Sequence, residues 1–167
     1  MKTGLTVLHD DLAKMAAGIK KLATTRVLVG VPSDKATRTD GPLNNAQLAY
    51  IQNNGAPEAN IPARPFMEPA IESKSREIRD ALGKAAELAL EAGPDAVDRQ
   101  FHRVGAIGRD AIKAKITDGP FTPLKPSTIA ARKSKRKSRS NTDIKPLIDT
   151  GSLRNSINYV IRDDDEK

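Results

Sequence analysis

Two proline-rich stretches most constrain what this chain can fold into. Residues 56–69 contain four prolines, and residues 117–126 contain three prolines and a glycine. Proline lacks a backbone N–H group and has a restricted φ, so neither stretch can form a helix interior or a central strand. We predict a rigid, extended connector at the first stretch and a second connector at the other. Regular structure is then confined to the segments around them.

The segments before and between the connectors carry helical periodicity. Leucine, methionine and isoleucine recur every three or four residues from Leu8 to Leu22, which predicts a helix over residues 7–23. Its apolar face packs on a core or, alternatively, binds a partner. The same spacing continues over residues 71–92 and 97–116, interrupted by Gly93-Pro94. This predicts a helical hairpin or one long kinked helix, and Gly105 and Gly108 indicate that another backbone comes close.

Shorter elements complete the expected fold. The run Val27-Leu28-Val29-Gly30-Val31 stops at a proline and predicts a strand, and residues 157–161 alternate in polarity like a final half-buried strand. Between them, Asn44 is a candidate cap for a short helix that stops at Gly55. The expected class is α+β, with a small antiparallel sheet packed against about three main helices in a single domain, residues 1–167.

The positive charge of the chain is concentrated in one segment. The net charge is +7, and residues 132–139 contribute six lysines and arginines without an acidic residue, so the rest of the chain carries only +1. Residues 133–143 contain almost no apolar side chain, which predicts a flexible basic loop. Residues 163–167 have the opposite sign and predict an acidic tail.

Several functional classes find no support in the residues. The absence of cysteine excludes disulfides, thiolate metal sites and a cysteine nucleophile. The histidines, His9 and His102, have no second ligand at a metal-binding spacing, and no nucleophile elbow or dinucleotide-binding loop is present. We therefore predict no enzymatic activity, no metal and no cofactor. No apolar run is long enough to span a membrane and no signal-peptide pattern is present, so we expect cytoplasmic synthesis and no membrane partner.

The basic segment is compatible with two kinds of partner. Its cations could neutralise phosphates, which would make binding to nucleic acid strongly dependent on salt. It has no interleaved aromatic or amide side chains for base contacts, so such binding would be non-specific. The alternative is an acidic protein neighbour, which could be the acidic tail of a second copy of the chain.

Three stretches carry a family resemblance. Residues 47–55 and 61–67 read Gln-Leu-Ala-Tyr-Ile-Gln-Asn-Asn-Gly and Ile-Pro-Ala-Arg-Pro-Phe-Met, residues 123–132 read Pro-Leu-Lys-Pro-Ser-Thr-Ile-Ala-Ala-Arg, and residues 145–157 read Lys-Pro-Leu-Ile-Asp-Thr-Gly-Ser-Leu-Arg-Asn-Ser-Ile. In this order they resemble the neck and tail-completion proteins of tailed bacteriophages, the phage virion morphogenesis family. The resemblance spans about residues 27–160, which is most of the chain.

The resemblance implies a non-enzymatic virion component at the head–tail junction. Such a chain completes the tail or joins it to the capsid as part of a hexameric ring, in contact with other neck and tail proteins. Rigid connectors suit docking because they lose less entropy on binding. The basic loop would meet an acidic patch on the next subunit or the packaged DNA. The alternative is a DNA-binding accessory or an assembly factor that the particle does not retain.

The resemblance also implies which residues bind partners. Arg64 would form an ion pair with its own fold or with a neighbour, and Phe66 would anchor the first connector, either on the helices or on a partner. The predicted partner-binding residues are Arg64, Phe66, Arg132, Lys133, Lys135, Arg136, Lys137 and Arg139. On this interpretation, replacing Arg64 with alanine leaves a folded monomer that assembles poorly.

Overall fold

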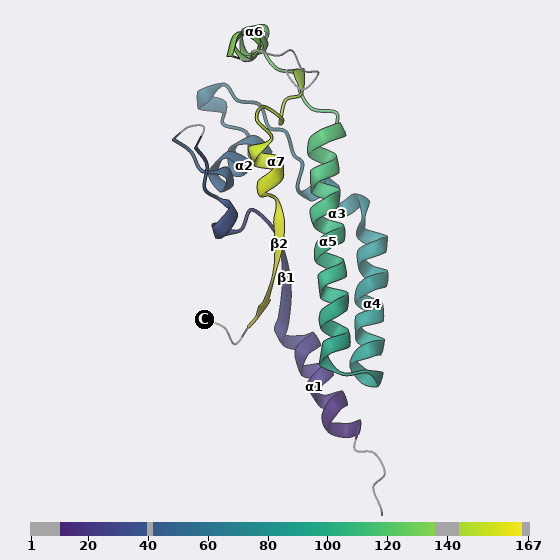
Figure 1. Ribbon diagram of the computed structural model, residues 1–167. Helices are drawn as coiled ribbons and strands as arrows, with labels where there is room; N and C mark the ends of the chain where they lie inside the picture. The colour runs from purple at the N-terminus through teal and green to yellow at the C-terminus, as the bar shows by residue number, and fades with distance from the viewer. Residues whose placement is uncertain (1–10, 40–41, 136–143, 165–167) are drawn as a thin grey trace, which may run out of the picture.

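One long helix organises the protein (Figure 1). The structure, a computed structural model, describes residues 11–39, 42–135 and 144–164. Helix α5 (Pro94–Asp118) lies between a two-stranded sheet and helix α4 (Ser75–Glu91), and helix α1 (Asp11–Thr24) packs against α4 and α5 at their lower ends. The sheet consists of β1 (Thr25–Gly30) and β2 (Asn158–Asp163). The other elements are α2 (Asn45–Asn54), α3 (Glu68–Ser73), α6 (Pro126–Lys135) and α7 (Ser152–Ser156), with 3-10 turns at Ser33–Lys35 and Pro57–Ala59.

The predicted α+β class is confirmed. The described chain is a small antiparallel sheet packed on helices, of which α1, α4 and α5 are the longest. The two alternatives at Gly93-Pro94 are resolved in favour of a helical hairpin. Gly93 has a left-handed φ of 81°, which glycine tolerates, and Pro94 occupies the first turn of α5, which proline favours. The chain therefore reverses direction between the two helices.

The sheet has one covered face and one open face. The strands pair antiparallel from Thr25 opposite Asp163 to Gly30 opposite Asn158. Because side chains alternate between the faces of a strand, one set is directed toward the helices and the other away from them. The covered set includes Val27, Val29 and Ile161, which pack on buried core residues, and Tyr159, whose ring contacts α5. The open face carries Arg26, Leu28, Val160 and Arg162.

The core consists of two clusters of mainly aliphatic side chains along α5. The upper cluster, near the carboxyl end of α5, includes the buried residues Phe66, Ile112, Ile116, Leu153 and Ile157. The lower cluster contains Ala85, Ala89, Val97 and Phe101, with partly buried side chains from α1, β1 and β2 packed against it. The upper cluster therefore holds the connectors and α7, whereas the lower cluster joins α1, α4, α5 and the sheet.

Small residues set the closest helix contacts. A Cβ atom at Gly105 would lie 2.3 Å from the ring of Tyr159, and one at Gly108 would lie 3.0 Å from a methyl carbon of Val29. Both glycines thus admit a close neighbour, but the prediction of a backbone neighbour is wrong, because side chains approach them. A backbone approaches Gly18 instead, where a Cβ atom would lie 2.3 Å from the carbonyl oxygen of Ala89. Helices α1 and α4 can pack this closely because residue 18 has no side chain.

The same substitution at two helical glycines should change stability in opposite directions. Gly18→Ala places a methyl group against the backbone of α4, and overpacking of this kind costs about 1–3 kcal/mol. Gly83→Ala, in α4, meets no atom within 4 Å and should gain about 0.5–1 kcal/mol from the helix propensity of alanine. Urea unfolding followed by far-UV circular dichroism measures both free energies. A stabilising Gly18→Ala would contradict the close packing of α1 on α4.

The first connector is not extended along its whole length. Residues 57–59 form a 3-10 turn, and Asn60 has a left-handed φ of 57°. Ala56 and Ile61 exchange backbone hydrogen bonds of 2.9 and 3.0 Å across this turn. The prediction of an extended connector is wrong here, because Pro57 has a φ that suits a tight turn as well as an extended chain.

The two charged segments have boundaries that differ from the prediction. Residues 133–135, predicted as loop, belong to α6, and residues 136–143 lie outside the described residues.

The first two residues of the predicted acidic tail, Asp163 and Asp164, form hydrogen bonds and ion pairs with other parts of the fold. Asp163 accepts hydrogen bonds from Thr25 and Lys21, and Asp164 forms an ion pair of 2.9 Å with an arginine of β1. The hydrogen bonds hold the pKa of Asp163 below its usual range because they stabilise the carboxylate. Residues 165–167 lie outside the described residues.

Candidate interaction site at the connectors

Arg64 links the first connector to the second. Its backbone N–H group donates to the carbonyl oxygen of Gln52 at 2.8 Å. Its guanidinium donates from Nη1 to Oε1 of Gln52 and from Nε to the carbonyl oxygen of Thr122, both at 3.0 Å. The residue is only 6% exposed. One side chain therefore joins α2, the first connector and the chain that follows α5.

The acceptors of Arg64 are neutral. The sequence predicts an ion pair for this residue, but the structure gives its guanidinium an amide and a carbonyl, and no ion pair within the described residues. Burial lowers the pKa of Arg64, and the positive charge of Arg132 lowers it further. Within the described residues, Arg64 therefore forms hydrogen bonds to neutral acceptors where the sequence predicts an ion pair inside the fold.

Phe66 lies in the core and not at a surface. Its side chain has no exposed area and packs in the upper cluster. The backbone N–H groups of Phe66 and Met67 both donate to Oδ1 of Asn53, at 3.0 and 3.2 Å, which fixes the connector on α2. A ring without exposed area cannot contact a partner, so we remove Phe66 from the partner-binding residues. Of the two roles considered for it, the structure supports the anchor on the helices.

Arg132, the first cation of the basic segment, binds its own chain. Its Nη1 atom donates to the carbonyl oxygens of Lys145 and Ile148 at 2.8 and 2.9 Å, and its Nη2 atom donates to that of Pro146 at 3.4 Å. Its Nε atom lies 3.8 Å from the carboxylate of Asp149. Arg132 therefore fastens α6 to the loop before α7, which is a role inside the fold and not the predicted role at a partner.

The other predicted cations lie on α6 or beyond it. Lys133 is exposed on α6, which ends at Lys135, whereas Arg136, Lys137 and Arg139 lie outside the described residues. Helix α6 stands beyond the carboxyl end of α5, at the opposite end of the molecule from α1 (Figure 1). Arg64 and Arg132 are thus used within the fold, and Lys133 is available to a partner.

Two cations of the third stretch, which were not among the predicted site residues, lie at the carboxyl end of α5. Lys145 donates from Nζ to the carbonyl oxygen of Thr117 at 2.8 Å and lies 3.5 Å from the carboxylate of Asp118. Arg154 donates from Nε to Oγ1 of Thr117 at 2.9 Å. A cation at a helix carboxyl end also interacts favourably with the helix dipole. No local pattern signals these contacts, because the partners are separated by 28 and 37 residues.

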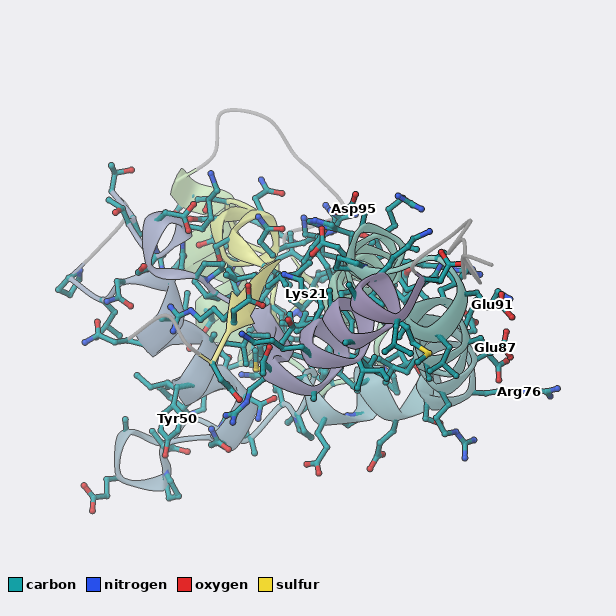
Figure 2. The ribbon with its side chains drawn as sticks, turned by 90° about the horizontal axis from the view of Figure 1, so that it is seen from below. Lys21, Tyr50, Arg76, Glu87, Glu91 and Asp95 are labelled. Carbon is teal, nitrogen blue, oxygen red and sulfur yellow. The ribbon has the colours of Figure 1, made fainter. Side chains whose placement is uncertain are left out.

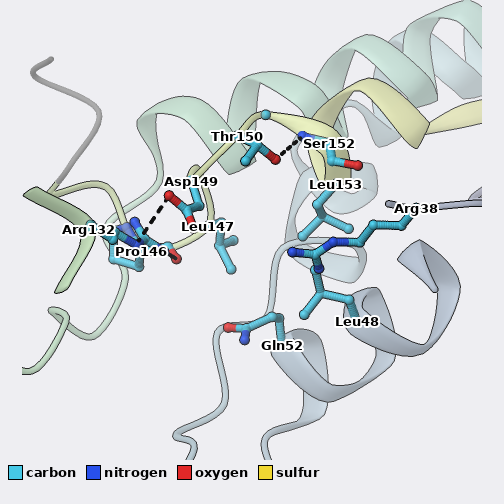
Figure 3. Close-up of a pocket in the computed structure, with 11 residues that line it drawn as sticks. Arg38, Leu48, Gln52, Arg132, Pro146, Leu147, Asp149, Thr150, Ser152 and Leu153 are labelled. Carbon is cyan, nitrogen blue, oxygen red and sulfur yellow. Dashed lines mark hydrogen bonds and ion pairs between the residues drawn. The ribbon is translucent and has the colours of Figure 1, made fainter. Parts of the chain in front are cut away.

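Two hollows flank the arginines. A pocket of about 130 Å³ lies between Arg38 and Arg132, and Figure 3 shows these two side chains reaching it from opposite sides. Asp149 lies at the same pocket, beside Arg132. An open groove of about 510 Å³ follows the two connectors and is lined by Arg64 and Lys125 among other residues. Cations therefore contribute to both hollows.

The described residues offer no metal cluster. Within residues 11–39, 42–135 and 144–164, no group of three or more histidines and acids could hold a metal ion. His102 is exposed, with Nε2 at 3.4 Å from Asp98 and Nδ1 at 3.2 Å from the hydroxyl of Tyr159. The contact with Tyr159 connects β2 to α5, whereas Asp98 belongs to α5 itself. His9 lies outside the described residues.

Comparisons with known proteins assign no family. No protein-family model matches the chain, and searches of the curated proteins and of the solved structures found no match. In the part of the chain that the structure describes, no helix has the length and apolar character needed to cross a membrane. Support for a function therefore comes from the sequence motifs and from the geometry around the arginines.

Proposed function

We propose that this chain is a non-enzymatic structural component of a tailed-phage virion at the head–tail junction. In this proposal it completes the tail or joins it to the capsid, as one subunit of a hexameric ring that contacts other neck and tail proteins. The three stretches that resemble the phage virion morphogenesis family suggest this role, and their arrangement in space supports it.

The observation that carries the proposal is that these three stretches meet at one place. Arg64 of the first stretch donates to Thr122, directly before the second stretch. Arg132 of the second stretch donates to carbonyl oxygens of the third. All three contribute residues to the pocket between Arg38 and Arg132. Arg64 and Arg132 thus hold the three stretches together as one unit, to which α6 with its exposed Lys133 belongs. A preorganised unit loses less entropy when it binds, so this arrangement supports α6 as the element that docks on a partner.

Quantitative mass spectrometry of purified particles tests the proposal. Particles from the phage or prophage that encodes the chain should contain it at a fixed ratio to the portal protein, and the ratio should survive a high-salt wash. Absence of the chain from intact particles would contradict a structural role and favour an assembly factor.

Charge reversal on α6 should impair incorporation without changing stability. Lys133→Glu removes an exposed cation that forms no ion pair within the described residues, so the fold should keep its free energy of unfolding within about 0.5 kcal/mol. We expect incorporation into particles to fall several-fold, because rim charges guide association. Arg103→Glu, at an exposed position of α5, is the matched control. Equal incorporation of the two variants would remove Lys133 from the interface.

A DNA-binding accessory is the second candidate, and the concentration of cations on α6 and the residues after it favours it. The purified chain would then bind duplex DNA with an affinity that falls steeply as salt rises. A fluorescence anisotropy titration at several salt concentrations measures this dependence. Lys133→Glu should make the DNA affinity less dependent on salt concentration if α6 contacts phosphates.

A further inference from the structure

We propose that copies of this chain associate head to tail, with the open face of the sheet in one copy against the outer side of α4 in the next. The inference rests on the proposed function and deepens it by naming the two surfaces that meet. We call them the sheet surface, which consists of Arg26, Leu28, Val160 and Arg162, and the helix surface, which consists of Leu82, Glu87, Leu90 and Glu91 of α4.

The sheet surface combines uncovered apolar side chains with cations. Leu28, 47% exposed, lies directly opposite Val160, and Arg26 lies directly opposite Arg162. Like charges in cross-strand pairs are destabilising. Asp164 compensates Arg26 at 2.9 Å, whereas Arg162 forms no ion pair within the described residues. A hollow of about 470 Å³ lies along Leu28, Val160 and Arg162. This face therefore offers an apolar surface and an arginine to a partner.

The helix surface has the matching character. Leu90 is 55% exposed, and Leu82, two turns earlier on α4, is also exposed. Glu87 pairs with Lys84 at 2.7 Å, but Glu91 forms no ion pair in the part of the chain that the structure describes. Figure 2 shows Glu87 and Glu91 projecting from the outer side of α4. Leu90 and Glu87 lie one turn apart on α4, so this surface offers an apolar side chain beside a carboxylate to a partner that carries apolar side chains and arginines.

A second copy of the chain is the partner that supplies both. Helix α5 separates the sheet from α4, so the two surfaces lie on opposite sides of the molecule and cannot meet within one copy (Figure 1). Two different complementary surfaces on one subunit produce a head-to-tail contact, which closes into a ring when the rotation allows it. A two-fold contact between sheet surfaces would instead place Arg26 and Arg162 of both copies on the two sides of one interface, and like charges facing each other cost electrostatic free energy.

Cysteine cross-linking tests which surfaces meet, and the absence of native cysteine makes it specific. Leu28→Cys and Leu90→Cys chains are mixed at high concentration and treated with a short bis-maleimide. We expect mixed dimers to exceed either homodimer about tenfold, and the double variant to form a ladder of oligomers. Leu43→Cys, an exposed leucine on neither surface, is the control and should cross-link to neither partner above background. Dominant Leu28→Cys homodimers, or no mixed dimers, would overturn the proposal.

An exchange of charges tests whether Arg162 of the sheet surface and Glu91 of the helix surface attract each other in the contact. Arg162→Glu in the Leu28→Cys chain should reduce the yield of mixed dimers about tenfold, and Glu91→Arg in the Leu90→Cys chain should restore it. Arg103→Glu in the Leu28→Cys chain, the matched control, should leave the yield unchanged. An Arg162→Glu chain that cross-links as well as its parent would overturn the pairing of these surfaces.

The outcomes separate this inference from the proposed function. If the chain is present in particles at a fixed ratio but forms no mixed dimers, these surfaces are wrong and the virion role stands. If mixed dimers form but particles lack the chain, the virion role is wrong and the head-to-tail contact stands.

Discussion

Phe66→Ala should lower the free energy of unfolding by about 3–5 kcal/mol. The ring has no exposed area and lies in the upper cluster, where its removal leaves a cavity among the packed side chains of α5 and α7. It also anchors the first connector, which carries Arg64. For a domain of this size, a loss of about 4 kcal/mol lowers the midpoint of thermal unfolding by roughly 10 °C. Urea unfolding with an unchanged m-value would assign the loss to stability alone.

Tyr50→Ala is the matched control for Phe66→Ala. Tyr50 is an aromatic residue of the same region, but it is 70% exposed on α2. Its removal should change the free energy of unfolding by no more than about 0.5 kcal/mol. A Phe66→Ala variant as stable as Tyr50→Ala would mean that the ring is not part of the core and would return it to the partner-binding residues.

Arg64→Ala should lower the free energy of unfolding by about 2–4 kcal/mol. The variant leaves the amide oxygen of Gln52 and the carbonyl oxygen of Thr122 without their donor, and it removes a side chain that is almost fully buried. Arg64→Lys should recover less than half of the loss, because a single ammonium group cannot reproduce the two directions of the guanidinium. Urea unfolding at neutral pH measures the three stabilities.

Lys125→Ala is the control for Arg64, because Lys125 lines the same groove but is exposed. We expect it to change stability by less than about 0.5 kcal/mol. The sequence alone predicts a different result for Arg64→Ala, namely a folded monomer with poor assembly. An Arg64→Ala chain with unchanged stability and reduced incorporation into particles would support that prediction and contradict a structural role for the guanidinium inside the fold.

Local sequence rules were sufficient for the elements themselves. The predicted cap of α2 is confirmed, since the Asn44 side chain accepts from the Gln47 backbone and the Gln47 side chain accepts from the Asn44 backbone. The predicted stop is confirmed as well, because Gly55 has a left-handed φ of 81°. Helical spacing likewise predicted α1 and α5 to within a few residues over their described parts, whereas the helix expected over residues 71–92 is divided at Lys74 into α3 and α4. These features depend on neighbours within one or two turns, so the sequence contains all the information that they need.

Long-range contacts assign the roles of the arginines. Arg64 and Arg132 are both cations beside proline-rich segments, and the sequence predicts partner binding for both, with an ion pair inside the fold as the alternative for Arg64. The acceptors that bury them lie 12 to 58 residues away, so no spacing rule reveals them. The exposed Lys133 lies one position after Arg132, and only the side of α6 that each residue occupies separates the exposed cation from the one that binds its own chain.

Local sequence patterns predicted the fold class, the positions of the long helices and the two strands to within a few residues, and the cap and stop of α2. Three features emerged only in the folded chain: Gly93-Pro94 makes a hairpin, Gly18 and not Gly105 meets a backbone, and the three motifs converge on two arginines. The reason is physical. Periodicity and capping are interactions between near neighbours in the chain, whereas the choice of a hydrogen-bond acceptor or a packing partner depends on which distant segments the folded core brings together.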